Sequence, residues 1–315
     1  MRGDMHLKRK VKYVGIIVLI AIMGVLIKDR IESKVSDQIG FLVLDEDGQV
    51  SRCVSLPKGV KGRIDYDAEQ GNYLYLDKEE GIIVEKNLQQ DKVVNEIKVE
   101  ELLAMIPEKE KAESDEFEED YTQTELCFSN VQYGYSEGTY SFIYNRMLYL
   151  YEREENKVTE IVTCQQDEDL QTYEWLDEEN VYILQEDTNM STIKNMVLWN
   201  CNSKSEKNVV AGPWNFMVDR ENRKIFYSTA WWKDTDWLGF SLVELSEEVG
   251  KKESRTLVED CEWALILYAK EERLFYCSQN YKGTKCKLYV IDLETGKRKK
   301  IYSTYMQIKG IVEGV

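Results

Sequence analysis

The chain has 315 residues, of which 43% are apolar and 31% are charged, with 20 Tyr and 7 Trp but only 3 Pro. Scarce proline with abundant aromatic residues favours a β-rich globular body and excludes a disordered or collagen-like chain. The single histidine is His6, near the start of the chain. The body beyond it therefore has no Ser-His-Asp triad, no Cys-His dyad and no histidine-bound metal.

The formal net charge of −17 is divided unevenly along the chain. Residues 1–34 carry eight basic and three acidic side chains, a net charge of +5, whereas the remaining residues carry 33 basic and 55 acidic side chains, a net charge of −22. A body this acidic repels the phosphates of DNA and RNA. We therefore expect no nucleic-acid partner.

Residues 13–27, YVGIIVLIAIMGVLI, form an uncharged apolar run. A helix of this length rises roughly 22 Å, less than the ~30 Å of a hydrocarbon core, but the flanking Lys12 and Lys28 can extend their charged ends to the interface. A cleaved signal peptide is the alternative. The run ends in VLIK, without the small residues that a cleavage site needs, which favours an uncleaved transmembrane helix.

The flanking charges predict the direction of this anchor. Four basic residues lie shortly before the apolar run, whereas basic and acidic side chains nearly cancel after it. An excess of Lys and Arg marks the cytoplasmic side of a membrane. We therefore expect a single-pass cell-membrane protein with its N-terminus in the cytoplasm. Its predicted parts are a basic tail (1–12), a signal-anchor helix (13–27), a linker (28–39) and an extracytoplasmic domain (40–315).

The body contains two repeated modules of paired strands. The first is a short apolar strand, a charged turn and an aromatic-rich strand, and its copies are residues 65–76, 133–144, 175–184, 216–227 and 267–276. The second is another strand–turn–strand unit, and its copies are residues 41–56, 147–162, 197–210 and 288–302. Together the modules supply four antiparallel strands, which we name a, b, c and d, as in one blade of a β-propeller.

The spacing of the modules favours a propeller. The charged turns at Asp177, Asp219 and Lys270 are 42 and 51 residues apart, close to the ~40–50 residues of a blade. An irregular β-sandwich also has short strands and frequent turns, but the ordered recurrence of both modules favours the propeller.

Both ends of the body contribute to one blade. Residues 41–56 resemble only the c–d half of a blade, and residues 306–312 resemble an a strand. We expect an all-β propeller of about six four-stranded blades, closed by a blade that both termini share and that lacks a normal b strand.

Two segments resemble the two halves of a TolB-like propeller repeat: VDRENRKIFYS at residues 218–228 and LYVIDLETGK at residues 288–297. The resemblance extends over residues 41–312, although charged turns replace the Ser-Pro-Asp-Gly turn that is usual between strands a and b in that family. It implies the six-bladed fold found in membrane-tethered bacterial extracytoplasmic proteins and a tendency toward binding roles, without an activity.

The long connections are predicted on one face of the propeller. Connections b–c and d–a emerge on one face, and turns a–b and c–d on the other. The long ones are residues 185–195, 229–239 and 278–285 (b–c) and residues 99–124 (d–a, an acidic insertion). Loops on a rigid scaffold are where binding usually occurs, so this face is the predicted binding surface.

The candidate ligand-binding residues lie in these connections. They are Trp231, Trp232, Asp234, Asp236 and Trp237 in the fourth blade, and Tyr281 in the fifth. Indole rings can stack on sugars or peptide side chains while carboxylates bind their polar edges. The alternative is that these tryptophans fill gaps between blades. We expect the other four tryptophans, Trp175, Trp199, Trp214 and Trp263, in the core.

Three smaller features complete the prediction. Residues 99–106 should form two helical turns ended by Pro107, before an acidic segment at residues 108–120. The segment from Asp45 to Gly48 contains part of a calcium-loop pattern, but it is better interpreted as a c–d turn in which Gly48 supplies a positive φ. No phosphate-binding loop or metal-ligand spacing is present, so we predict no cofactor and no metal.

The chain has seven cysteines, an odd number, so not all of them can pair within one molecule. Cys277 and Cys286 flank the fifth-blade b–c connection and are a possible disulfide in an oxidising compartment.

The function predicted from these features is that of a non-catalytic, membrane-tethered extracytoplasmic propeller. It would bind a protein, peptide or glycan through its b–c/d–a face. We assign no catalytic residue. One alternative is a carboxylate-based carbohydrate-active enzyme, a glycosidase or lyase, at the propeller channel. Another is a structural subunit of a cell-envelope complex.

Overall fold

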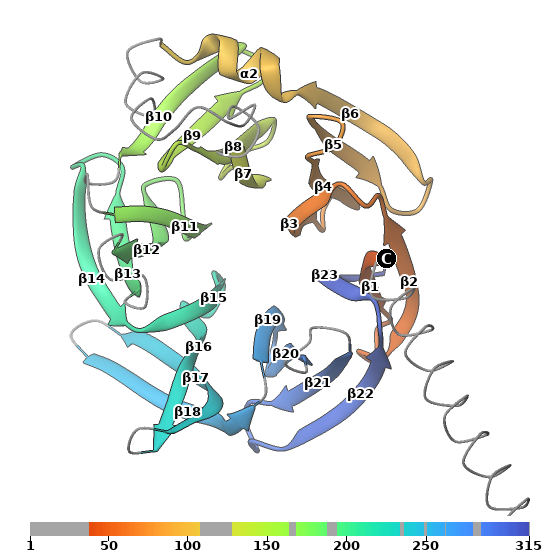
Figure 1. Cartoon of the computed structure of the whole chain (residues 1–315), viewed down its shortest axis with the longest axis vertical. Helices are drawn as coiled ribbons and strands as arrows, with labels where there is room; N and C mark the ends of the chain where they lie inside the picture. Colours follow the sequence, from red (N-terminus) through yellow and green to blue (C-terminus); the bar gives the residue numbers. More distant parts are fainter. Residues whose placement is uncertain are drawn as a thin grey trace, which may run out of the picture.

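Six β-sheets are arranged as blades around a common axis in the computed structural model (Figure 1). The structure describes residues 38–107, 128–163, 168–187, 194–233, 236–248, 251–261, 263–279 and 285–314. Five blades are four-stranded and antiparallel, with strand a innermost and strand d at the rim. The all-β, six-bladed prediction is confirmed.

The strands of the five complete blades follow the predicted modules. The first blade is β3 (Val60–Asp67), β4 (Asn72–Asp77), β5 (Ile82–Asn87) and β6 (Lys92–Lys98); the second is β7 (Phe128–Tyr133), β8 (Thr139–Tyr144), β9 (Met147–Glu152) and β10 (Lys157–Thr163); the third is β11 (Glu168–Trp175), β12 (Asn180–Asp187), β13 (Lys194–Asn200) and β14 (Ser205–Ala211); the fourth is β15 (Pro213–Asp219), β16 (Lys224–Lys233), β17 (Asp236–Glu248) and β18 (Lys251–Cys261); the fifth is β19 (Trp263–Lys270), β20 (Arg273–Gln279), β21 (Cys286–Asp292) and β22 (Arg298–Thr304).

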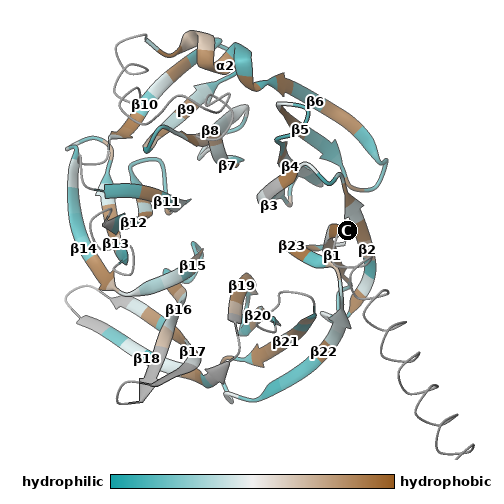
Figure 2. Cartoon of the chain, viewed as in Figure 1, coloured by the Kyte–Doolittle hydropathy of each residue, from teal (hydrophilic) through white to brown (hydrophobic). Residues whose placement is uncertain are grey.

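The core consists of apolar layers between neighbouring blades, because each sheet is covered on both faces. Strands b of the first two blades, β4 and β8, are buried at every position. Strands at the rim of the ring are not buried on both faces and can be polar. Strand β22 is largely hydrophilic, whereas its neighbour β21 carries the apolar side chains (Figure 2). Burial on both faces explains why strands b appear in the sequence as nearly continuous apolar runs.

The closing blade has three strands, in the order β2–β1–β23. These are β1 (Ile39–Leu44), β2 (Val50–Leu56) and β23 (Gln307–Glu313). Strand β23 pairs with β1 in parallel, with Val312 opposite Val43, whereas β1 and β2 are antiparallel. Strands a and c of an antiparallel blade run in the same direction, so β23 and β1, which correspond to strands a and c, pair in parallel. The predicted closing blade, which both ends of the body share, is confirmed.

Strand β1 occupies the position that strand b has in the other blades, and all six of its residues are buried. Phe41 and Val43 pack toward the first blade, whereas Leu42 and Leu44 pack toward the fifth. The turn that follows is the predicted one: Gly48 has a φ of +73° and donates its N–H to the carbonyl of Asp45 at 2.9 Å. One short strand thus seals two blade interfaces.

Helix α2 (Val99–Met105) covers the outer seam between the first and second blades (Figure 1). Leu102, Leu103 and Ile106 are buried against both blades, and the helix ends before Pro107, as predicted. In the described part of the chain no helix is long and apolar enough to cross a membrane. The predicted anchor at residues 13–27 and the acidic segment at residues 108–120 lie outside that part.

The fourth blade is longer than its neighbours, and this corrects the prediction of a loop at residues 229–239. Strands β16 and β17 continue through this segment, pairing Trp231 with Gly239, Trp232 with Trp237 and Lys233 with Asp236. At the other end, β17 and β18 continue beyond the a–b turn, pairing Glu248 with Lys251. The fourth blade is therefore extended at both ends, by the β16–β17 hairpin on one face and by the β17–β18 hairpin on the other.

Candidate ligand-binding face

The candidate site lies on the face where the b–c and d–a connections emerge. Here strands β14 and β15 are joined at Gly212, which has a φ of +84° that glycine adopts without strain. The Gly212 N–H donates to the carbonyl of Lys194 at 2.7 Å, and the Thr229 hydroxyl donates to the Gly212 carbonyl at 3.1 Å. These bonds attach the connection to the third and fourth blades at once.

Trp214, two residues later, is 36% exposed. This corrects the expectation that it belongs to the core. The Lys194 ammonium lies 5.1 Å from the centre of the indole ring, and Phe240 meets the ring edge-on at 5.7 Å between centroids. A cation over an indole face is a favourable arrangement. The ring is therefore presented to solvent in a fixed position.

Lys194 is itself held from the other side. Its ammonium lies 3.4 Å from a carboxylate oxygen of Glu186, the residue directly opposite it on β12. Both side chains are largely buried. Glu186 therefore positions Lys194, and Lys194 in turn orients the indole ring of Trp214 without covering its outer surface.

A second lysine–aromatic pair occurs on the same face. The Lys285 ammonium lies 5.5 Å from the centre of the Tyr305 ring, which is in the d–a connection between β22 and β23. The fourth-blade hairpin lies between the two pairs in the order of the chain. We name these parts together, Trp214 with Lys194, the hairpin at residues 229–239, and Tyr305 with Lys285, the aromatic face.

Of the predicted site residues, the structure describes only part. Trp231, Trp232, Asp236 and Trp237 have described backbones within β16 and β17, and Trp232 and Trp237 are cross-strand partners. Asp234, Tyr281 and the side chains of the hairpin lie outside the described residues. Among the expected core tryptophans, Trp175 is fully buried and Trp199 is half-buried against the same layer.

Sequence reasoning missed Trp214, Lys194 and Tyr305. The available signal was position: Trp214 follows the Gly-Pro pair of a d–a connection, and Tyr305 lies between two predicted strands. Residues at the ends of innermost strands lie at the propeller's face, beyond the layers between blades.

Charged groups also meet across the propeller axis, at the opposite end. Arg63 on β3 donates from Nη1 to Glu174 Oε1 on β11 at 3.0 Å and to the Phe216 carbonyl on β15 at 3.3 Å. These three strands are the innermost strands of the first, third and fourth blades, which lie on different sides of the axis (Figure 1). The hydrogen bonds of Arg63 therefore join blades across the axis. Arg63 and Glu174 are only partly accessible.

The carboxylates of this axial network are occupied by internal hydrogen bonds. Asp65 accepts the N–H of Tyr133 at 2.8 Å and that of Tyr66 at 3.0 Å. Burial raises the pKa of Asp65 and of Glu174, while Arg63 and Arg220 act in the opposite direction. Both carboxylates lie near the a–b turns, away from the aromatic face, so these two do not form a common site with the tryptophan hairpin.

The disulfide candidates lie on neighbouring strands β20 and β21. Cys277 is opposite Leu288 and Cys286 is opposite Gln279, so the two cysteines are diagonal neighbours on one face of the sheet. Their Cα atoms are 5.9 Å apart, and the structure joins their sulfur atoms. Both residues are buried.

Removing this bond should lower stability moderately. The bridge closes a loop with a sequence separation of nine residues, for which chain entropy gives a loss of about 2–3 kcal/mol on reduction. Denaturation with and without dithiothreitol measures the loss. A Cys277→Ala/Cys286→Ala variant should match the reduced protein and show no further effect of the reductant. Alkylation of both thiols in the unreduced, denatured protein would contradict the pairing.

The described strands form a six-bladed β-propeller, and this fold is similar to that of TolB proteins. TolB from Acinetobacter baumannii aligns with a TM-score of 0.56 and 8% identity, over 88% of this chain and 67% of that one. A protein assigned as TolB from Agrobacterium tumefaciens aligns with a TM-score of 0.57 and 7% identity, over 83% and 89%. A chain of the nidogen/laminin complex aligns with a TM-score of 0.54 and 8% identity, over 85% and 93%.

Sequence comparison adds no nearer relative. No protein-family model matches the chain, and no curated protein matches it at a significant level. Identities this low establish the fold alone. A fold does not by itself specify a function, so the function has to be argued from the surface residues.

Proposed function

We propose that the chain is a membrane-tethered extracytoplasmic propeller that binds a protein partner through its aromatic face. The observation that carries this proposal is the fourth-blade hairpin, in which three tryptophans occupy positions on the paired strands β16 and β17, in the same blade as the exposed Trp214 on β15. Tryptophan is enriched among the residues that dominate binding energy at protein interfaces. Strand pairing holds the described backbone of this hairpin in an extended form before binding, which lowers the cost in conformational entropy.

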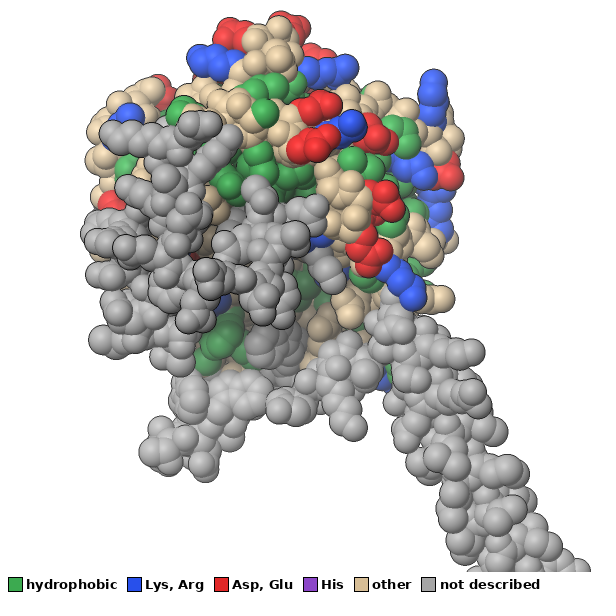
Figure 3. Space-filling model, turned by 45° about the horizontal axis from the view of Figure 1, so that its top comes forward, with side chains coloured by type: hydrophobic (Ala, Val, Ile, Leu, Met, Phe, Trp, Pro, Cys, Tyr) green, Lys and Arg blue, Asp and Glu red, His purple; other side chains and the backbone are tan. Residues whose placement is uncertain are grey.

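Three further arguments support the parts of this proposal. The charge asymmetry around residues 13–27 favours a cytoplasmic N-terminus and an external propeller. The nidogen/laminin complex is a protein assembly that includes a chain of similar fold. On the side of the ring visible in Figure 3, acidic and basic side chains are interspersed among the described residues, without a patch of a single sign.

The test is cross-linking and affinity capture of the full-length chain from intact cells, followed by mass spectrometry. Replacing Trp214, Trp231, Trp232 and Trp237 by Ala should weaken binding to the captured protein by about 100-fold or more, since hot-spot truncations cost about 2 kcal/mol or more each. Purified binding partners then give the affinity.

The matched control is Tyr135→Ala. Tyr135 is 39% exposed but lies in the a–b turn of the second blade, on the opposite face. This variant should bind as the wild-type protein does. Unchanged capture by the tryptophan variant would exclude the aromatic face, and binding of glycans with no protein captured would replace the protein partner by a carbohydrate.

A further inference from the structure

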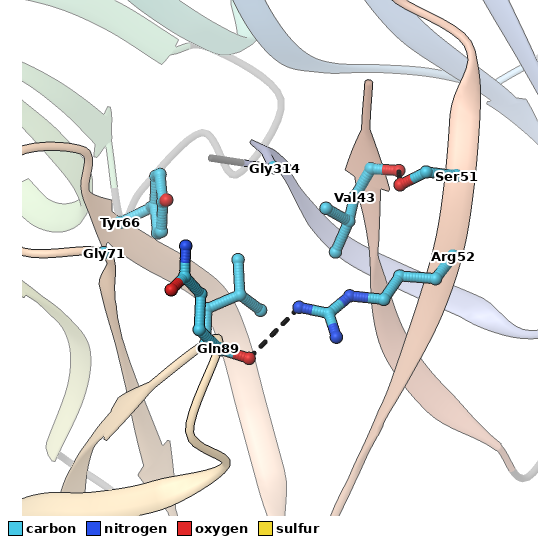
Figure 4. A pocket seen from close by; sticks show the side chains of 8 residues that line it. Val43, Ser51, Arg52, Tyr66, Gly71, Gln89 and Gly314 are labelled. Atoms are coloured by element: carbon cyan, nitrogen blue, oxygen red, sulfur yellow. Dashed lines mark hydrogen bonds between the residues drawn. The ribbon is translucent and has the colours of Figure 1, made fainter. Parts of the chain in front are cut away.

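A cavity of about 350 Å³ lies at the seam between the first blade and the closing blade. It opens on the a–b/c–d face, opposite the aromatic face, so it is independent of the proposed function. Its lining residues come from β1, β2 and β3, from the turn between β3 and β4, and from the residues that directly follow β5 and β23 (Figure 4). We name it the seam pocket; its lining residues are Val43, Ser51, Arg52, Tyr66, Gly71, Leu88, Gln89 and Gly314.

The seam pocket has an apolar floor and a polar rim. Val43 and Leu88 are buried at its base, whereas Arg52 and Gln89 are exposed at its mouth. Arg52 is the one charged residue in the lining, and its side chain extends toward the first blade across the mouth (Figure 4). Its Nη2 donates to the Leu88 carbonyl at 3.1 Å, which holds the guanidinium in place.

Arg52 also supplies most of the hydrogen-bond donors that a ligand would meet. The hydroxyl of Ser51 already donates to the Val43 carbonyl at 3.0 Å, and that of Tyr66 donates to the Glu313 carbonyl at 3.1 Å. A guanidinium has five N–H donors, of which the Leu88 carbonyl takes one. Its planar fork matches carboxylate and phosphate oxygens. Recognition of an anion here would thus depend on Arg52.

The surrounding charges define how an anion would lie. Asp67 and Glu313 act electrostatically on Tyr66, so the Tyr66 end of the pocket repels negative charge. Glu313 is paired with Lys270, and Asp67 accepts the N–H of Glu69 at 2.9 Å. The anionic group of a ligand should therefore lie at Arg52, with its apolar part over Val43 and Leu88.

We propose that the seam pocket binds a small organic anion that carries one carboxylate or phosphate group and a short branched apolar group. The volume lies at the lower end of the ~300–1,000 Å³ typical of ligand pockets, which suits a metabolite-sized molecule. Such a ligand would contact both blades of the seam where the ring closes. Because it binds only the closed ring, it would also stabilise the folded propeller.

The probes are isovalerate, isobutyl phosphate and the neutral isovaleramide, measured by calorimetry and thermal unfolding of the full-length chain in detergent. We expect millimolar binding and a raised melting temperature with at least one of the two anions, and no effect of the amide. Arg52→Gln should weaken binding about tenfold or more, because charge-assisted hydrogen bonds are lost. The anion that binds more tightly identifies the preferred group.

Two variants serve as controls. Arg153→Gln removes an exposed arginine from the turn between β9 and β10 and should leave binding unchanged. Gln89→Trp narrows the mouth while Arg52 is retained and should block binding. Equal affinity of the wild-type protein and Arg52→Gln, or the absence of binding by both anions at millimolar concentrations, would overturn the proposal.

Discussion

Replacing Val312 by Asp should destabilise the propeller by more than about 4 kcal/mol, because it buries an unpaired carboxylate. Val312 is fully buried in the layer between the closing and first blades, opposite Val43 of β1. A charge there cannot reach water without separating β23 from β1. Since these two strands join the ends of the ring, we expect the loss to affect the whole domain and not one blade.

Chemical denaturation followed by circular dichroism and tryptophan fluorescence measures this loss. The matched control is Gln307→Asp on the same strand, where the side chain is exposed. It should change the free energy of unfolding by about 0.5 kcal/mol or less. If Val312→Asp were as stable as this control, closure of the ring by β23 would be wrong.

Replacing Arg63 by Gln should cost about 2–3 kcal/mol near neutral pH. The substitution removes the cation that is hydrogen-bonded to the Glu174 carboxylate, and removing one partner of a largely buried ion pair is costly. The cost is lower than for a fully buried pair because both side chains retain some exposure. The bond from Arg63 to the Phe216 carbonyl is lost as well.

The cost should depend on pH in a definite direction. Burial raises the pKa of Glu174 above its ordinary 4.5, and Arg63 lowers it, so removal of Arg63 raises this pKa further. A raised folded-state pKa means that the folded protein holds the proton more tightly than the unfolded chain does. The associated stability is complete below the unfolded pKa and is lost as pH rises through the folded pKa. Arg63→Gln should therefore be least destabilising at acidic pH.

Denaturation curves at several pH values test this dependence. Adding Glu174→Gln to Arg63→Gln removes the main titrating group, so the double variant should recover part of the stability at neutral pH. It should also lose most of the excess pH dependence; the remainder comes from Asp65, whose pKa Arg63 also lowers. The same loss at every pH in Arg63→Gln would show that the missing hydrogen bonds, and not the unpaired carboxylate, cause the effect.

The strands and turns of the repeated modules could be predicted from the sequence because local interactions determine them. The turns at Asp177 and Asp219 bond to backbone N–H groups within three residues, at 3.0 Å to Glu179 and 3.1 Å to Asn222. Such contacts are the same in any tertiary context.

The candidate site was harder to predict than the modules. Residues 229–239 contain polar residues typical of a connection, yet their backbones pair in an extended hairpin. Trp214 is a large aromatic residue of the kind expected in a core, but its position at the start of β15 leaves its side chain 36% exposed. Whether a side chain at a strand end is buried depends on how far the strands of the neighbouring blade extend along the propeller axis. The residues around that side chain in the sequence do not determine this extent.

By itself, the sequence determined the blade pattern, the position of the closing strands, the acidic body and the absence of histidine chemistry from it. Each of these follows from residue type and spacing along the chain. The tertiary structure alone decided that Arg63 meets Glu174 across the axis, that Lys194 supports Trp214, and that Arg52 lies over a pocket at the seam. These contacts join residues 111, 20 and up to 262 positions apart, because closing the ring brings distant blades together.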